Sequence, residues 1–309
     1  MMVRLSLALL VAIPAAMAYP WDSTADRWLL GVAIGWVVVL FAWWRGLFVT
    51  TMIARRIAMW RRRGRAHGSH HSSEFATVAL RVTPRTDEEL PLDLLVGYLD
   101  RYGIDFDKVR VSSRDVAGVR TTWIGLTLGA VDNIAALSAR SASIPLRDTA
   151  ELCARRLADR LRELGWEVSD ADLAAGARPL AATGAKETWR AVSDEQGHLA
   201  AYRITVDEEL ADTLAAVWAA GAAETWTALE LTGSRAHPEL VAVCALRSDD
   251  RPAAKAPLSG LSPYHGLHGV VLAALSPTSD DRLPGDPAAL PPTLTARLRW
   301  PAGVALSRT

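Results

Sequence analysis

WLLGVAIGWVVVLFAWWRGLF, residues 28–48, is the stretch that decides the fold class of this chain. It contains no charged side chain from Trp28 to Trp44. At the rise of an α-helix, its 21 residues extend over about 30 Å, which is the thickness of the hydrocarbon core of a bilayer. The sequence therefore predicts a membrane-spanning helix over this stretch.

A second apolar stretch, residues 5–19, precedes it. It is shorter and contains Pro14, but residues 1–3 extend it if Arg4 reaches up to the headgroups. Ala16 and Ala18 would also suit the cleavage site of a signal peptide. We favour a retained helix, because only Arg4 precedes the apolar core and the chain re-enters apolar sequence within ten residues. Residues 1–49 are then a transmembrane helical hairpin.

Six arginines follow the second apolar stretch and set the predicted orientation. They are Arg55, Arg56, Arg61, Arg62, Arg63 and Arg65. The short connection between the two stretches holds only Asp22, Asp26 and Arg27. Because positively charged flanks stay on the cytoplasmic side, we expect a multi-pass protein of the cell inner membrane. Both termini and the remainder of the chain should be cytoplasmic, with the arginine cluster binding anionic lipid headgroups at the membrane surface.

The remainder of the chain is acidic. Beyond residue 65 it carries 25 basic and 32 acidic side chains, whereas the first 65 residues carry 9 basic and 2 acidic ones. Nucleic-acid binding depends on clustered Lys and Arg that neutralise phosphates, so nucleic acid is not an expected partner.

Small residues follow one side of the second predicted helix. Gly31, Gly35, Ala42 and Gly46 lie within about 60° of one helix face at 100° per residue. Gly31 and Gly35 form a GxxxG step, which lets another helix approach closely in lipid. We predict a helix-packing face whose partner is the first helix or another protein, although such faces also arise by chance in alanine-rich chains.

Three further regions follow the hairpin. Residues 50–73 are expected to form a basic juxtamembrane helix with an apolar side of Ile53, Ile57 and Trp60, followed by a polar linker. Residues 74–251 should form a cytoplasmic mixed α/β domain. Residues 252–309 contain 9 of the 16 prolines and are expected to be mostly irregular, either wrapping over the domain or presenting a surface to a partner.

Periodicity predicts the elements of residues 74–251. Helical spacing runs from Leu92 to Tyr102 and ends at Gly103, and a longer helix should start near Asp148 and end before Gly165. Strands are expected at 78–82, 108–113, 121–128, 188–192, 199–206, 224–231 and 240–246. Hairpin turns at 115–118 and 194–197 begin two similar runs, which predicts two related strand–strand–helix units.

Motifs for catalysis are scarce. The chain has no phosphate-binding GxxxxGK[ST] loop, no GxGxxG and no HExxH. Cys153 and Cys244 lack metal-ligand spacing and should be small buried residues, and His265 and His268 are interpreted as solvated loop histidines. We therefore expect no catalytic residue, no cofactor, no metal and no small-molecule substrate.

Long blocks of the sequence resemble the EccE family of mycobacterial type VII secretion systems. The similarity is carried by YPWDSTADRWLLGV (19–32), VGYLDRYGIDFDKVR (96–110), VDNIAALSARSASIPLRDT (131–149), GAKETWRAV (184–192), ETWTALELTGS (224–234) and DRPAAKAPLSGLSP (250–263). In particular, these blocks resemble the paralogue that belongs to the system linked to iron and zinc acquisition. The resemblance extends from the hairpin to about residue 263.

This resemblance implies a non-catalytic structural subunit of an inner-membrane protein secretion complex. Family members have two N-terminal helices and a cytoplasmic domain, and they assemble with EccB, EccC and EccD, of which EccC is the ATPase. The hairpin and the absence of a nucleotide motif agree with that role.

Two other functions are open from the residues alone. Asp105 and Asp107 form a D-x-D step, which could hold a divalent cation against a nucleotide sugar in a membrane-anchored glycosyltransferase. Asp170 and Asp172 form a second such step. Alternatively, the chain could act as a lipid-surface adaptor through the arginine cluster alone.

Overall fold

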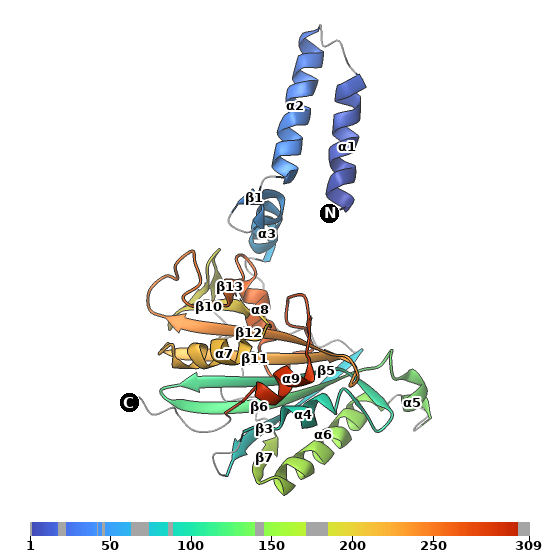
Figure 1. The fold of residues 1–309 in the computed structure, drawn as a ribbon, viewed down its shortest axis with the longest axis vertical. Coiled ribbons are helices and arrows are strands. Elements are labelled where there is room, and N and C mark those ends of the chain that lie inside the picture. Colours follow the sequence, from blue (N-terminus) through green and yellow to red (C-terminus); the bar gives the residue numbers. More distant parts are fainter. Residues whose placement is uncertain are drawn as a thin grey trace. The chain divides into compact units, whose positions relative to one another are not determined.

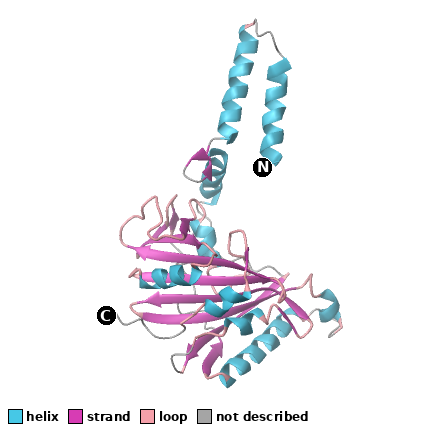
Figure 2. Cartoon of the chain, in the orientation of Figure 1, coloured by secondary structure: helices cyan, strands magenta, loops and turns pink. Residues whose placement is uncertain are grey.

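The structure is a computed structural model that describes residues 2–17, 23–41, 43–44, 47–62, 74–85, 89–139, 145–170 and 185–301. The chain divides into two compact units, Met1–Arg63 and Gly64–Thr309. Figure 1 labels the elements of each unit, and Figure 2 shows that helices dominate the first and strands the second.

The first unit is helical. Helices α1 (Met2–Met17) and α2 (Thr24–Phe41) pack side by side, with Ala8, Ala15 and Ala33 buried. A short antiparallel pair, β1 (Trp43–Trp44) and β2 (Leu47–Phe48), then precedes helix α3 (Val49–Arg62). Small alanine side chains at the α1–α2 contact allow the two helices to approach closely.

Helix α2 is shorter than the sequence predicted. It ends at Phe41, and Trp43–Trp44 pairs with Leu47–Phe48 instead of continuing the helix to residue 48. Aromatic and large apolar residues favour extended backbone, which accounts for this change. Within the described ranges, none of the helices is both long enough and apolar enough to cross a membrane. The membrane-spanning hairpin therefore stays a prediction.

An antiparallel sheet forms the frame of the second unit. The order of its main strands is β7–β3–β6–β5–β11–β12–β10–β9–β8. The bounds are β3 (Phe75–Pro84), β5 (Ile104–Val116), β6 (Val119–Gly129), β7 (Trp166–Asp170), β8 (Lys186–Glu187), β9 (Val192–Asp194), β10 (Gly197–Ile204), β11 (Glu224–Gly233) and β12 (Pro238–Ser248). Three short strands join it at the sides: β4 (Asp100–Arg101), β13 (Leu261–Pro263) and β14 (Ala288–Ala289).

Helices cover both faces of this sheet. The larger core lies under α4 (Leu92–Val96), α6 (Leu146–Glu163), α7 (Leu210–Ala219) and α9 (Pro292–Arg297). A smaller core on the opposite face lies under α8 (His268–Ala274) and includes the stacked rings of Trp123 and Trp226. A further short helix, α5 (Ile134–Ser138), follows β6.

The same strand–helix–hairpin motif occurs twice. In β3–α4–β5–β6 and in β10–α7–β11–β12, the first strand pairs with the last, and the two copies meet where β5 pairs with β11. The predicted hairpin turns after Asp115 and Asp194 are both present. However, the two hairpins do not occupy equivalent places, because β5–β6 lies in the middle of the sheet and β9–β10 lies near its edge.

Most expected strands are confirmed, and one expected helix is too long. The run from Leu92 to Tyr102 forms a helix only as far as Val96, after which the chain turns into β4. Leu99 and Tyr98 are buried although they lie outside the helix. The expected strand at 188–192 is also displaced, with β8 ending at Glu187 and β9 beginning at Val192.

The proline-rich segment packs onto the sheet as far as residue 301. Strand β13 pairs with β10, helix α8 is buried, and Trp300 is fully buried beside Trp218. Of the two alternatives left by the sequence, the described part of this segment therefore wraps over the domain.

Candidate interaction surfaces and buried polar networks

The predicted helix-packing face begins on an exposed side of α2. Gly31 and Gly35 are exposed, and a Cβ atom added at either would meet nothing within 4 Å. The contact with α1 buries Ala33 instead, so the GxxxG step does not face α1. Ala42 and Gly46 lie outside the described residues. A face that is open in the chain alone is available to a helix from another protein.

The predicted basic cluster lies on and after α3. Arg55, Arg56 and Arg61 belong to this helix, which Arg62 ends, while Arg63 and Arg65 lie outside the described residues. Ile53, Ile57 and Trp60 lie on one side of α3 and are 48%, 53% and 69% exposed. Apolar side chains left in water beside arginines are typical of a helix that lies in the headgroup layer of a membrane.

The fold uses the carboxylate of Asp107 and the backbone of Asp105 in the D-x-D step. The β5–β6 pairing shifts register between Phe106 and Lys108, which places Asp107 at an irregularity in the strand. There Asp107 forms an ion pair with Arg282. The backbone of Asp105 is held by the Asn133 side chain, which accepts from its N–H at 2.9 Å and donates to its carbonyl at 2.7 Å.

No group of three His, Cys, Asp or Glu side chains suited to a metal ion occurs in the described part of the chain. The second D-x-D step cannot be placed, because Asp172 lies outside it.

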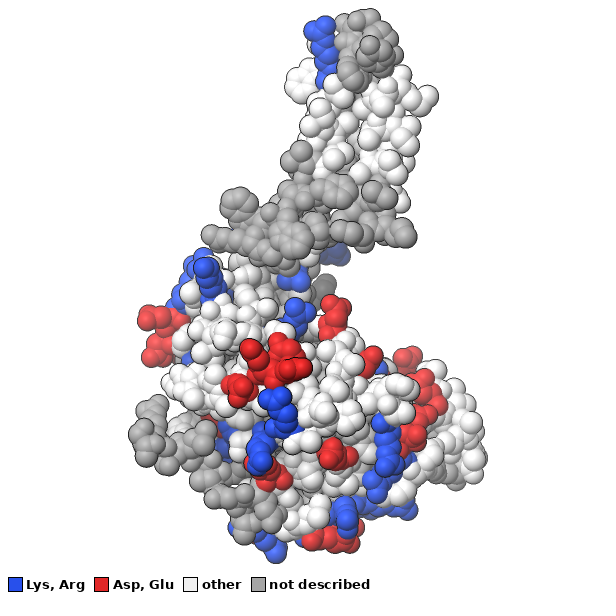
Figure 3. Space-filling model, viewed as in Figure 1, with Lys and Arg blue, Asp and Glu red and all other residues white. Residues whose placement is uncertain are grey.

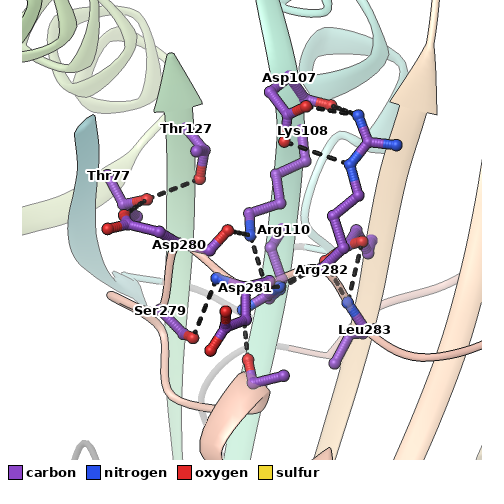
Figure 4. A network of polar contacts seen from close by, with 12 residues as sticks. Thr77, Asp107, Lys108, Arg110, Thr127, Ser279, Asp280, Asp281, Arg282 and Leu283 are labelled. Atoms are coloured by element: carbon purple, nitrogen blue, oxygen red, sulfur yellow. Dashed lines mark hydrogen bonds and ion pairs between the residues drawn. The ribbon is translucent and has the colours of Figure 1, made fainter. Parts of the chain in front are cut away.

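Two cations lie buried on the α8 face of the sheet, where sequence reasoning placed no site (Figure 4). Lys108 and Arg110 alternate along β5 and are 1% and 2% exposed. Lys108 donates to the carbonyls of Asp280 and Asp281 at 2.6 and 2.5 Å. Arg110 donates through Nε to Glu230 at 3.0 Å and also to the carbonyls of Ala274, Ser276 and Asp281.

These contacts attach residues 276–283 to the sheet. Two further hydrogen bonds hold the segment, because Thr77 donates to Asp280 at 2.6 Å and the Leu283 N–H donates to Glu230 at 3.1 Å. Gly125 on β6 leaves room for it, since a Cβ atom there would lie 2.7 Å from the Pro277 carbonyl. We call Lys108, Arg110, Glu230 and residues 276–283 the loop-anchoring network.

Burial alters the proton affinity of the lysine in this network. The pKa of Lys108 is lowered from 10.5 to about 7, chiefly by loss of hydration and also by the charge of Arg110, whereas Glu230 acts in the opposite direction. The amine of Lys108 therefore titrates close to neutral pH, while its two carbonyl acceptors can be satisfied by the neutral form as well.

Stability should consequently rise with pH in a way that depends on Lys108. Between pH 7 and 9 the unfolded chain keeps the lysine proton while the folded chain loses it, so the free energy of unfolding increases by up to about 1.4 kcal/mol per pH unit. Urea denaturation of the full chain in mild detergent, followed by far-UV circular dichroism, measures this slope. We expect Lys108→Met to flatten it and the exposed Lys186→Met to leave it unchanged. Equal slopes in all three proteins would contradict the assignment.

A second buried ion-pair cluster joins four strands. Glu224 accepts from Arg247 and from Arg114 at 2.6 Å each, and Arg247 also donates to Asp194 at 2.6 Å. The Trp226 indole N–H donates to Glu224 at 2.9 Å. This cluster connects β5, β9, β11 and β12, and each of its two arginines is paired with a carboxylate.

The interpretation of His268 as a solvated loop residue is wrong. His268 is fully buried at the start of α8, where Nδ1 accepts from the Ala201 N–H at 3.0 Å. Burial lowers the pKa of His268 to about 3, with His265 contributing in the same direction, so the imidazole is neutral. The ring of His265 stacks on Trp189 at 5.6 Å between centroids. Cys153 and Cys244 are both buried, as the sequence predicted.

Sequence reasoning missed the buried cations because their pattern is that of a half-exposed strand. In Lys108–Val109–Arg110–Val111 the charged residues alternate with valines, which normally places the charges in solvent. The acidic pair Asp280–Asp281 could have suggested a partner for these cations. In the structure, however, Lys108 binds the backbone carbonyls of Asp280 and Asp281.

The fold and these contacts define a two-unit protein. A helical N-terminal unit with exposed apolar side chains precedes a mixed α/β unit, in which the two central strand–helix–hairpin motifs form one antiparallel sheet. On the visible face in Figure 3, the described part of the α1–α2 hairpin is almost without charged side chains, whereas charges of both signs are interspersed over the second unit.

Comparison with known proteins identifies the family. The family model for EccE, a type VII ESX secretion system translocon, matches residues 116–204. The ESX-3 secretion system protein EccE3 of Mycolicibacterium smegmatis is 52% identical over 291 residues, covering 94% of this chain and 93% of the relative. EccE3 of Mycobacterium tuberculosis strain H37Rv is 47% identical over 309 residues, covering 98% and 92%. This chain belongs to the EccE family of type VII secretion system proteins.

Proposed function

We propose that this protein is a non-catalytic structural subunit of the inner-membrane core complex of a type VII secretion system of the ESX-3 kind. It would assemble with EccB, EccC and EccD and with membrane lipids. The observation that carries the proposal is identity of about half the residues to EccE3 proteins over nearly the whole chain. The family is one of secretion system components, and in each described polar cluster the charged side chains pair with partners inside the fold.

The exposed apolar residues of the first unit support a membrane location. Leu9, Leu10 and Ile13 on α1 and Val32 and Ile34 on α2 are between 48% and 69% exposed. Large apolar side chains exposed around both helices are unfavourable in water and favourable in lipid. We infer that residues 1–49 lie in the inner membrane and that the arginines on and after α3 face the cytoplasmic leaflet.

Affinity purification tests the assembly. A tagged full-length chain, recovered from native membranes in mild detergent, should bring EccB, EccC and EccD with it, as identified by mass spectrometry. Recovery of the chain without these subunits would overturn the proposed role and favour a lipid-surface adaptor.

Cysteine labelling in intact cells tests the topology. Because Cys153 and Cys244 are buried, neither is a useful probe, and an exposed cysteine must be introduced. We expect Gln196→Cys, in the exposed turn between β9 and β10, to resist membrane-impermeant maleimide until the inner membrane is opened. Labelling in cells whose inner membrane is intact would contradict a cytoplasmic domain.

Gly35→Leu should weaken recovery of the complex more than it weakens membrane insertion. A Cβ atom at Gly35 meets nothing within 4 Å in the chain, so we expect the leucine to be accommodated and to block close approach of a partner helix. We expect recovery of the partner subunits to fall by roughly 10-fold, which corresponds to about 1.4 kcal/mol. Val32→Phe adds similar bulk about 60° to 100° away on α2 and serves as the control. Equal recovery with Gly35→Leu and with the unsubstituted chain would count against this interface.

A further inference from the structure

The turn between β4 and β5 holds a tyrosine in an uncommon backbone conformation. Tyr102 and Gly103 have φ angles of 61° and 67°, so both central residues of this two-residue hairpin loop lie in the left-handed region. Such a turn favours Asn-Gly, and an aromatic residue at its first central position is disfavoured. The base of the hairpin is fixed, because the Phe106 N–H donates to the Leu99 carbonyl at 2.9 Å and Asn133 holds Asp105.

Two arginines contact the ring of this tyrosine. The guanidinium of Arg156, from α6, lies 4.5 Å from the Tyr102 ring centroid, and that of Arg101 lies 5.3 Å from it. Tyr102 is nevertheless 44% exposed. Leu152, one turn before Arg156 on α6, is 48% exposed. Because residues four apart are neighbours on a helix, Leu152 adds an exposed aliphatic side chain beside Arg156.

The two cations lack a carboxylate partner. In the portion of the chain that the structure describes, no ion pair within 4.0 Å involves Arg101 or Arg156. Four other arginines on α6 do have a carboxylate partner. Arg147 and Arg155 pair with Glu151, Arg160 pairs with Glu163, and Arg162 pairs with Asp159. An exposed aromatic ring beside two arginines with no counter-ion has the composition of a protein–protein hot spot.

We propose that Arg101, Tyr102, Leu152 and Arg156 form a docking site for an acidic segment of another subunit of the secretion complex, with an Asp or Glu carboxylate directed at these arginines. The proposal rests on the proposed function. An apolar side chain next to that carboxylate would pack on Tyr102 and Leu152. The fixed hairpin presents the ring without further ordering, which favours binding.

The local charge favours a peptide over a membrane surface. Asp100 and Asp105 are exposed and directly opposite each other on β4 and β5, next to the docking site. They would repel a continuous anionic lipid surface, whereas a single carboxylate directed at Arg101 and Arg156 can avoid them.

Photo-crosslinking within the assembled complex tests the proposal. Benzoylphenylalanine replaces Leu152 in the full-length chain, and the complex is irradiated in native membranes before purification and mass spectrometry. We expect a crosslink to a subunit segment that contains Asp or Glu, with a yield that falls as salt is raised. A crosslink to lipid, a crosslink to a segment without acidic residues, or no crosslink in a complex that is otherwise recovered overturns the proposal.

Matched substitutions separate binding from folding. In the crosslinking chain, Arg156→Ser should reduce the yield at least about 10-fold, while Arg155→Ser, on the adjacent residue whose arginine is already paired, should not. Tyr102→Asn suits the turn better, so it should keep or raise the melting temperature and still lose the crosslink. Equal effects of Arg155→Ser and Arg156→Ser, or an unchanged yield with Tyr102→Asn, would refute the site. Failure to recover any other subunit with the unsubstituted chain would instead refute the proposed function together with the site.

Discussion

Trp300→Ala should lower the free energy of unfolding of the second unit by about 3–5 kcal/mol. Trp300 is fully buried, and its ring meets that of Trp218 edge-on at 5.4 Å. Its carbonyl accepts from the Leu90 N–H at 3.1 Å, and the carbonyl of the following Pro301 accepts from Arg120 at 2.9 Å. Removing the indole therefore leaves a cavity and also weakens the attachment of the segment after α9.

Hydrogen exchange of β11 and β12 in the full chain, measured by mass spectrometry, reports this loss as faster exchange of the most protected amides. Trp300→Phe is the matched control. The Trp300 indole N–H has no hydrogen-bond partner among the described residues, so phenylalanine loses volume without losing a hydrogen bond and should cost less. Half-buried Trp189→Ala should also have a smaller effect. Protection in Trp300→Ala that equals that of the unsubstituted chain would show that the segment does not stabilise the sheet.

Glu230→Ala should cost about 3–5 kcal/mol, because it leaves the buried Arg110 without its carboxylate. Arg110 and Glu230 are 2% and 1% exposed, so water cannot replace the lost partner readily. Glu230 also accepts from the Leu283 N–H, and its loss should release residues 276–283 from the sheet. Increased exchange of amides in that segment, together with faster exchange in β5 and β11, would be the expected result.

A double substitution tests whether the cost comes from an unpaired buried charge or from altered packing of the side chains. Arg110→Met combined with Glu230→Leu removes both charges and should cost much less than the sum of the single substitutions, because no unpaired buried charge remains. Glu239→Ala on β12 provides a surface control, since its carboxylate is exposed. If the double variant is as unstable as the two single changes added together, the pair is not coupled as the geometry indicates.

Local periodicity was a reliable guide in the sheet and less reliable near Tyr102. Strands β6, β11 and β12 were expected within a few residues of their bounds, because β-branched and aromatic residues with turn signals at each end favour strands wherever they pack. The helix expected from Leu92 to Tyr102 ends at Val96. Burial of Tyr98 and Leu99 against the sheet satisfies the same apolar spacing without a helix, so the spacing alone was ambiguous.

One candidate surface could be predicted from the sequence and the other could not. Gly31 and Gly35 were identifiable because a helix has a fixed angular spacing, and the structure adds that their side of α2 is open within the chain. The docking site around Tyr102 was not identifiable, because Arg156 lies 54 residues after Tyr102 and contacts its ring only in the folded protein. The positive φ of Tyr102 likewise has no signature in the sequence other than the following glycine.

The sequence by itself determined the family, the apolar character of the N-terminal segments and the places of most strands. Each of these depends on composition and on spacing within about 20 residues, which local chemistry fixes. Only the tertiary structure decided that the charged side of β5 is buried. Lys108 and the Asp280 carbonyl that accepts from it are separated by 172 residues, and their contact exists only because the proline-rich segment returns across the sheet. Whether a charge faces water depends on what covers it, and here the cover is a distant part of the chain.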